Sequence, residues 1–271
     1  MLGQLLWNAV DKAIIGDNVK RRYNFIRRLP LGAIKFAGNR GFVRLVRYLV
    51  EKSPFYKEKF SQYKINPTKV RRPEDLGDFY TTSEDLKERP AKDFLCGPRP
   101  QLVFDTTGTK SPKPKQIFFS YKEIEHYAKE GSAGMYHIGI RPEDKVISMM
   151  DTSFWNAAWT SREALRKLGC LYIEASKILP EEFYARASEH DFNVLLAEPS
   201  WLHLLTQVAA KKGFWPLKLI LLGGENITEQ SRSTLEAAWK TDVLLAYGQT
   251  EAFGSTGLEC RRKQGYHINE N

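Results

Sequence analysis

Residues 194–226 have the sequence VLLAEPSWLHLLTQVAAKKGFWPLKLILLGGEN, and this stretch decides the fold class. Two short apolar runs, Val194–Ala197 and Leu217–Leu222, lie on either side of a candidate helix, Ser200–Lys212. Short apolar runs bounded by turn residues are typical of strands buried on both faces. A helix between two such strands favours a parallel pair, because parallel strands need a crossover connection. We therefore expect a strand–helix–strand unit here.

The same alternation continues in both directions from this unit. The other candidate strands are Leu102–Phe104, Gln116–Phe119, Lys145–Met149, Leu171–Glu174 and Val243–Ala246. The other candidate helices are Tyr121–Tyr136, Trp155–Leu168, Glu181–His190 and Glu229–Lys240. This order predicts an α/β fold, with a mostly parallel sheet flanked by helices on both faces. Ligands of such sheets bind beyond the carboxyl ends of the strands, so we look for chemistry there.

The first third of the chain has a different pattern. Residues 1 to about 62 are predicted to be helical, with Pro54 in a first helical turn. Residues 63–100 are irregular, apart from a helix start at Thr82. We expect a helical and irregular region over residues 1–100 that packs on an α/β core over residues 101–271.

Composition limits the class of protein. The chain has 271 residues, of which 42% are hydrophobic and 27% charged, as in an ordinary globular protein. We find no apolar run that could span a membrane, and the three cysteines form no CxxC pair, which favours a reduced, cytoplasmic setting. Much of the net charge of +9 lies within residues 20–47. These basic residues could form a surface that binds polyanions, or they could be the solvated face of amphipathic helices. The helical spacing of apolar residues there favours the second interpretation, and we expect no nucleic-acid partner.

Three polar segments follow candidate strands. Asp105–Lys115 carries hydroxyl side chains around Gly108 and several lysines, which could surround phosphate oxygens, or it is only a hairpin loop. Leu222–Asn226 ends a strand in two glycines, which permits a flat ligand to approach or forms an ordinary turn. Ala246–Glu251 ends a strand in a hydroxyl and a carboxylate; Glu251 could hold Mg²⁺, or it is an exposed turn residue.

Taken together, these segments resemble the adenylate-forming superfamily in order and approximate spacing. Within it, the chain is most similar to the phenylacetate–CoA ligases. The further matching motifs are Ser53-Pro54-Phe55-Tyr56-Lys57, Pro73-Glu74-Asp75-Leu76, Thr81-Thr82-Ser83-Glu84-Asp85-Leu86, Glu259-Cys260 and Gly265-Tyr266-His267-Ile268-Asn269-Glu270. The resemblance runs from about residue 43 to the end of the chain.

The resemblance implies an AMP-forming acid–CoA ligase, which joins a carboxylic acid to ATP and then transfers the acyl group to CoA. An aryl acid such as phenylacetate is favoured. The implied contacts are Thr106, Thr107, Gly108 and Thr109 to the β- and γ-phosphates, Gly224, Glu225 and Tyr247 to adenine, Thr250 to the α-phosphate, and Glu251 to Mg²⁺. On this basis residues 101–271 would be a nucleotide-binding core, with Thr250 and Glu251 as its catalytic residues.

Two further sites carry open alternatives. Phe154 and Trp155 stand where the family forms part of its aryl-binding wall, but they could equally pack the following helix onto the sheet. Cys260 and His267 have the spacing of family members that bind a structural zinc ion. The other two ligands of such members are cysteines further along, so a site formed by this chain would be half built.

The chain also departs from the family pattern. Lys110 and Ser111 replace a Thr and a Gly of the phosphate loop. The ribose-binding Asp, the hinge and the small C-terminal domain with its catalytic Lys are absent, so we expect an incomplete N-terminal domain that does not complete the reaction alone. Its partner would be a separate C-terminal half or a second copy in a homodimer. The alternatives are a non-catalytic nucleotide-binding remnant or subunit, and a nucleotidyl transferase acting on a deazaflavin coenzyme.

Overall fold

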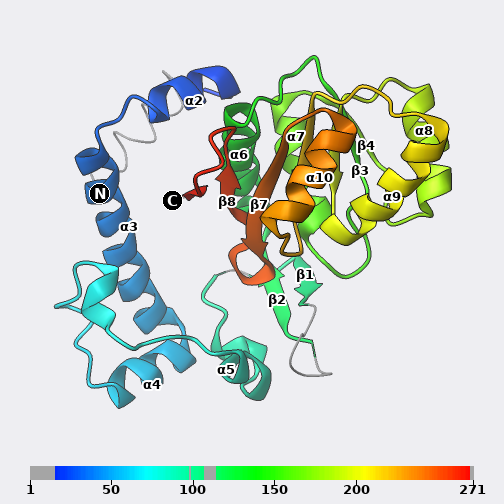
Figure 1. The fold of residues 1–271 in the computed structure, drawn as a ribbon. Coiled ribbons are helices and arrows are strands. Elements are labelled where there is room, and N and C mark those ends of the chain that lie inside the picture. Colours follow the sequence, from blue (N-terminus) through cyan, green and yellow to red (C-terminus); the bar gives the residue numbers. More distant parts are fainter. Residues whose placement is uncertain (1–15, 98, 107–113, 269–271) are drawn as a thin grey trace. The chain divides into compact units, whose positions relative to one another are not determined.

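The computed structural model describes residues 16–97, 99–106 and 114–268, drawn in colour in Figure 1. The contacts divide the chain into two compact units. Of the described residues, the larger unit comprises 16–27 and 122–268, and the smaller unit comprises those within 28–121. The division that we expect at about residue 100 stays a prediction.

The larger unit is built on a mixed sheet. In the described part of the chain its strands follow the order β4-β3-β5-β6-β7-β8-β9. Their bounds are β3 Lys145–Ser148, β4 Leu171–Glu174, β5 Val194–Ala197, β6 Leu219–Leu222, β7 Val243–Gln249, β8 Gly254–Glu259 and β9 Tyr266–Ile268. The strands from β4 to β7 pair in parallel, whereas β8 and β9 continue the sheet antiparallel. The α/β fold with a mostly parallel sheet is therefore confirmed.

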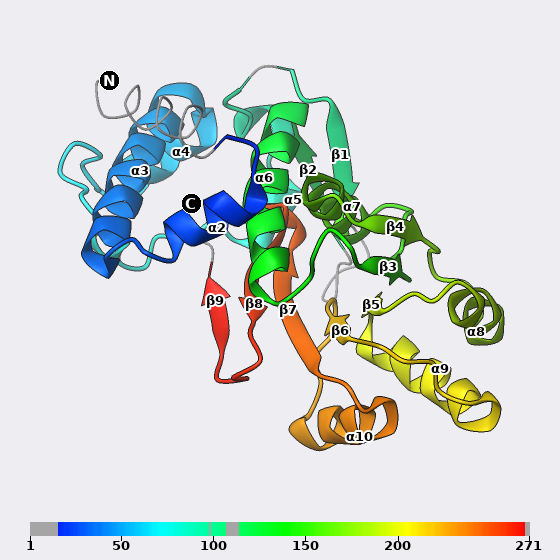
Figure 2. The ribbon, with the colours of Figure 1, turned by 90° about the horizontal axis from the view of Figure 1, so that it is seen from above.

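Helices cover both faces of this sheet (Figure 2). Helices α8 (Pro180–Glu189), α9 (Pro199–Lys212) and α10 (Glu229–Trp239) bury one hydrophobic cluster, to which β5 contributes Leu195. Helices α6 (Tyr121–His137) and α7 (Ala157–Leu168), together with Val19 of α2 (Val19–Ile26), bury the other, to which β5 contributes Val194 and Leu196. Because successive side chains of a strand point to opposite faces, the uninterrupted apolar run of β5 serves both clusters.

The smaller unit has its own hydrophobic core, formed by Val46, Phe60, Val70 and Phe79. Its helices are α3 (Leu31–Lys52), α4 (Pro54–Gln62) and α5 (Ser83–Glu88), with short 3₁₀ turns at Pro73–Leu76 and Ala91–Asp93. Strands β1 (Leu102–Asp105) and β2 (Gln116–Phe119) pair antiparallel with each other. Both strands were predicted, but they form a separate hairpin and not part of the parallel sheet.

The helix starts predicted at Pro54 and Thr82 are confirmed, whereas α7 begins at Ala157, two residues after the predicted Trp155. Ser53 caps α4 by accepting a hydrogen bond from the Tyr56 amide, and Pro54 occupies the first turn. Thr82 begins α5 in a capping box with Asp85, and Thr228 caps α10. Among the described residues, no helix combines the length and apolar character that a membrane span requires.

Candidate functional site

The end of β6 lies beside the middle of β7. Leu222, the last residue of β6, pairs with Leu245, so Gly223 follows β6 beside Ala246, where β7 continues beyond its neighbour. A Cβ atom on Gly223 would come within 3.7 Å of Ala246 and 3.8 Å of Met150, which follows β3. Three strands that are distant in the sequence therefore meet here, as ligand sites of parallel sheets require.

Gly224 and Glu225 form the turn after β6. Gly224 has a φ of 83°, a left-handed conformation that glycine adopts without strain. The Glu225 carboxylate accepts hydrogen bonds from the amide of Ser200 at 2.9 Å and from its hydroxyl at 2.8 Å, at the start of α9. This side chain therefore has a structural role as a cap for a neighbouring helix, so a contact of this turn with a ligand would use its backbone.

Tyr247, Thr250 and Glu251 lie at the far end of β7. The Tyr247 ring is 54% exposed, and a short 3₁₀ turn, Thr250–Ala252, carries the half-buried Thr250 and Glu251. The backbone passes very close to itself at the glycines on either side of this turn. A Cβ atom on Gly248 would lie 2.7 Å from the carbonyl carbon of Gly254. The two glycines thus permit the close approach that returns the chain into β8.

The segment after β3 leads to the same turn. Asp151 accepts a hydrogen bond from the Ser153 amide at 2.6 Å, and Asn156 donates from its amide nitrogen to the Thr250 carbonyl at 3.5 Å. Phe154 is 69% exposed and Trp155 is half-buried. Which of the two predicted roles these side chains have, a wall for the acid or packing of α7, stays a prediction.

The predicted phosphate loop lies mostly outside the described residues, including Thr107, Gly108 and Thr109. Thr106 is described and is 9% exposed in the smaller unit. Its amide donates to the Lys115 carbonyl at 3.0 Å, and its hydroxyl accepts from the Lys115 amide at 3.2 Å. The first of these bonds continues the backbone ladder of the β1–β2 hairpin by one pair, and the second ties the Thr106 side chain to the same pair.

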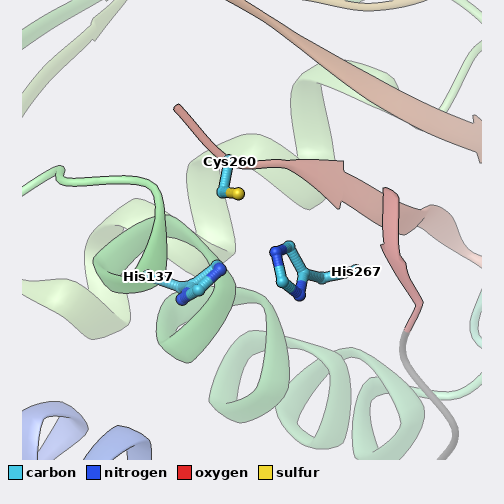
Figure 3. Close-up of side chains that lie close together, drawn as sticks. All are labelled: His137, Cys260 and His267. Carbon is cyan, nitrogen blue, oxygen red and sulfur yellow. The ribbon is translucent and has the colours of Figure 1, made fainter. Parts of the chain in front are cut away.

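Cys260 and His267 lie together on the β8–β9 hairpin, and a third residue joins them. Figure 3 shows His137 of α6, Cys260 and His267 around a common point. One ligand atom from each lies within 4.8 Å of the others, and the two imidazole rings are 4.4 Å apart and nearly perpendicular. Burial lowers the pKa of His137, and the charge of His267 lowers it further. Neutral imidazole and cysteine sulfur are the donors that bind zinc.

The hairpin register explains why these groups meet. His267 pairs with Leu258, and Cys260 stands two residues after Leu258, directly beyond the end of β8, so the strand's alternation directs it to the same face. Leu258 packs in the cluster that contains Met135 and Ile138. A Cβ atom on Gly134 would lie 2.7 Å from Leu258, so glycine lets α6 approach the strand closely, one helical turn before His137.

His137 was not among the predicted site residues. The residue stands at the end of α6, far from Cys260 along the chain, and no local spacing links the two. Only the packing of α6 against β8 brings the imidazole to the hairpin.

Comparison with known proteins defines the class of fold. The chain superimposes on the open conformation of a 2-hydroxyisobutyryl-CoA ligase with a TM-score of 0.80, at 18% identity over 89% of this chain and 55% of that one. It also matches the N-terminal domain of FACL13 from Mycobacterium tuberculosis, with a TM-score of 0.51 and 20% identity over 65% of this chain and 44% of that one. The fold is that of the N-terminal domain of adenylate-forming ligases.

The sequence is similar to two phenylacetate–coenzyme A ligases in particular. It is 22% identical to that of Pseudomonas putida over 94% of this chain and 58% of the relative, and 23% identical to that of Thermus thermophilus over 90% and 56%. No family model matches the chain. The resemblance inferred from the motifs is therefore confirmed, and the chain spans a little over half the length of the curated relatives it matches.

Proposed function

We propose that the chain is the nucleotide-binding part of an AMP-forming acid–CoA ligase. The observation that carries this proposal is the meeting of three strands, where the segments after β3 and β6 lie beside β7 and the turn that follows it. The similarity to phenylacetate–CoA ligases supports the same reaction class. In the proposal, the acid attacks the α-phosphate of ATP, pyrophosphate leaves, and the CoA thiol then displaces AMP.

The proposed contacts are those that the motif resemblance implies. The exposed Tyr247 ring and the backbone of Gly224 and Glu225 would border the adenine; Tyr247 belongs to β7, and the turn of Gly224 and Glu225 follows the adjacent strand β6. Thr250 offers a hydroxyl to the α-phosphate, and Thr106–Thr109 would face the β- and γ-phosphates. Glu251 provides a half-buried carboxylate oxygen, the kind of ligand that Mg²⁺ takes alongside substrate phosphates.

We propose an aryl acid as the substrate class. The support is the exposed Phe154 ring, in a segment whose Asn156 side chain donates to the Thr250 carbonyl. The reacting carboxylate of an acid stacked on Phe154 would then be near the α-phosphate that Thr250 is proposed to contact. Aromatic rings favour such offset or edge-to-face packing.

We also propose a zinc ion, bound by Cys260 and His267, which would stabilise the β8–β9 hairpin. The donors fit zinc because thiolate sulfur and imidazole nitrogen are its usual protein ligands, whereas Mg²⁺ prefers carboxylate oxygens. The catalytic proposal does not depend on this ion.

Calorimetric titration with ATP and MgCl₂ tests the nucleotide site. We expect Mg²⁺-dependent binding of ATP, weakened on the order of tenfold or more by Glu251→Gln. The matched control is Glu229→Gln, which removes a 77% exposed carboxylate from α10. A nucleotide-binding remnant would bind ATP without any response to acids, whereas a ligase should bind aryl acids more tightly once ATP is present. Lack of any ATP binding would refute the proposal.

A further inference from the structure

We propose that His137 is the third protein ligand of the zinc ion, so that one metal ion joins helix α6 to the β8–β9 hairpin. The inference rests on the zinc site proposed above for Cys260 and His267. The added ligand comes from helix α6, so the ion would link two elements that are distant in the sequence, in addition to stabilising the hairpin.

The first support is the unpaired nitrogen of His137. Its Nε2 atom is buried and has no hydrogen-bond partner among the residues that the structure describes. Buried polar atoms are nearly always paired, because an unmade hydrogen bond costs the desolvation free energy of the group. A metal ion bound at Nε2 would satisfy this atom, and one ring nitrogen of His137 lies within 4.8 Å of ligand atoms of Cys260 and His267.

The second ring nitrogen of His137, Nδ1, has a partner that favours the tautomer protonated at Nδ1, which leaves Nε2 free to bind zinc. Nδ1 lies 3.4 Å from the hydroxyl oxygen of Tyr23 on α2. A ligand nitrogen must be unprotonated, so Nδ1 then carries the proton and donates it to the Tyr23 oxygen. The Tyr23 ring packs against Tyr136 at 5.3 Å and against His137 at 5.6 Å. Tyr23 is thus a positioning residue, which fixes the orientation of the imidazole.

The spacing of the three donors is slightly wider than a bound ion requires. Tetrahedral zinc with bonds of about 2.0–2.3 Å separates its ligand atoms by about 3.5 Å. The donor atoms here lie within 4.8 Å of one another, so small side-chain rotations close the site. His267 is exposed, and Cys260 follows β8 in a turn closed by a hydrogen bond from the Lys263 amide, so both can adjust without disturbing the core.

A cavity of about 480 Å³ provides an entry path, since His137 and Cys260 are part of its wall. The wall also carries four positively charged side chains, those of Arg141, Lys218, Arg261 and Arg262. Two of these charges lie beside carboxylates: Lys218 contacts Asp144 at 2.6 Å, and Arg261 contacts Asp242 at 3.3 Å. The fourth position of a three-ligand zinc ion could then take a water molecule from this cavity.

Zinc binding to chelator-treated protein tests the inference. A competition titration with a chromophoric chelator should give one zinc ion per wild-type chain. His137→Gln, Cys260→Ser and His267→Gln should each weaken binding on the order of a hundredfold, because each removes one of three ligands. The matched control is His126→Gln, which replaces an exposed histidine of the same helix and should leave the affinity unchanged.

The outcomes separate the two proposals. If the wild type takes up no zinc, the site proposed for Cys260 and His267 is wrong, and this inference fails with it. If His137→Gln binds zinc as tightly as the wild type, while Cys260→Ser and His267→Gln do not, only the role of His137 is wrong. Circular dichroism of the metal-free variants establishes that each is folded.

Two measurements do not depend on the His137 variant. X-ray absorption at the zinc edge of the wild type should show one sulfur and two imidazole ligands; a single imidazole would overturn the proposal. Tyr23→Phe keeps the ring and removes the acceptor of the Nδ1 proton, so zinc affinity should fall about tenfold. An unchanged affinity would show that Tyr23 does not position the ligand.

Discussion

Arg232 of α10 and Glu259 at the end of β8 form a two-pronged ion pair whose side chains are only 4% and 6% exposed. Both guanidinium nitrogens Nη1 and Nη2 donate to the carboxylate, and Nε donates to the Val243 carbonyl at 3.0 Å. The carboxylate also accepts from the Leu245 amide at 3.2 Å. The pair therefore fixes the end of β8, immediately before Cys260, against β7 and α10.

Glu259→Gln should destabilise the protein by up to about 3 kcal/mol, because it removes the buried carboxylate of the pair and leaves Arg232 only the longer contacts with Glu229 at 3.6 Å and Glu236 at 3.9 Å. Urea unfolding measures this. The matched control is Glu229→Gln, since Glu229 also contacts Arg232, at 3.6 Å, but is 77% exposed. Its loss should cost less than about 1 kcal/mol. Equal effects of the two substitutions would contradict the prediction.

Gly248→Ala should cost roughly 1–3 kcal/mol, because the added Cβ atom would overlap the backbone of Gly254, which cannot move as a flexible side chain can. It should also displace Thr250 and Glu251, which lie between the two glycines. Gly41→Ala is the control: nothing lies within 4 Å of that site in α3, and alanine should stabilise the helix by up to about 1 kcal/mol. Thermal unfolding of both variants distinguishes the two effects; a neutral Gly248→Ala would show that the turn relaxes.

Glu174→Gln should stabilise the protein at neutral pH. Burial raises the pKa of Glu174 above its ordinary value of 4.5, although Tyr172 donates a hydrogen bond to the carboxylate. The folded state then holds a proton that the unfolded state releases, so stability is lost as pH rises from about 4.5 through the raised pKa. The melting temperatures of the wild type and of Glu174→Gln, measured between pH 4 and 8, should therefore converge at low pH and separate as pH rises. A difference in melting temperature that does not change with pH would contradict the prediction that Glu174 titrates with a raised pKa.

Cys170 should resist alkylation in the folded protein. Burial, together with the charge of Asp144, raises the pKa of Cys170 to about 12, from an ordinary value of 9.0. Because the thiolate is the reactive form, labelling at pH 8 should be roughly a thousandfold slower than that of an unperturbed thiol. Peptide mass spectrometry after iodoacetamide treatment, with urea-unfolded protein as the control, measures the rate. Equal labelling in both states would contradict the prediction.

The strand and helix pattern of the larger unit was largely predictable. Gln116–Phe119, Leu171–Glu174 and Val194–Ala197 were predicted with the bounds that the structure has. Short apolar runs between turn residues carry this information locally. The prediction missed β8 and β9, because GSTGLE and YHI are short, polar or glycine-containing segments whose pairing depends on partners elsewhere in the chain.

The candidate site was only partly predictable, since single residues do not reveal their partners. The sequence indicated Tyr247, Thr250 and Glu251 because they directly follow a strand. It gave no sign that the Glu225 carboxylate caps α9, or that Asn156 contacts the Thr250 carbonyl. The roles of the nucleotide-facing residues stay predictions that the titrations above address.

By itself, the sequence determined the α/β class, the order of the elements and two of the residues of the candidate metal site, Cys260 and His267. Hydrophobic spacing and motif order are local properties, so they can be recognised along the chain. Only the tertiary structure decided that β1 and β2 form a separate hairpin, and that His137 completes the group around Cys260. Those relationships depend on which surfaces pack together: Gly134 lets α6 approach β8 closely, and that contact joins residues whose distance along the chain carries no such information.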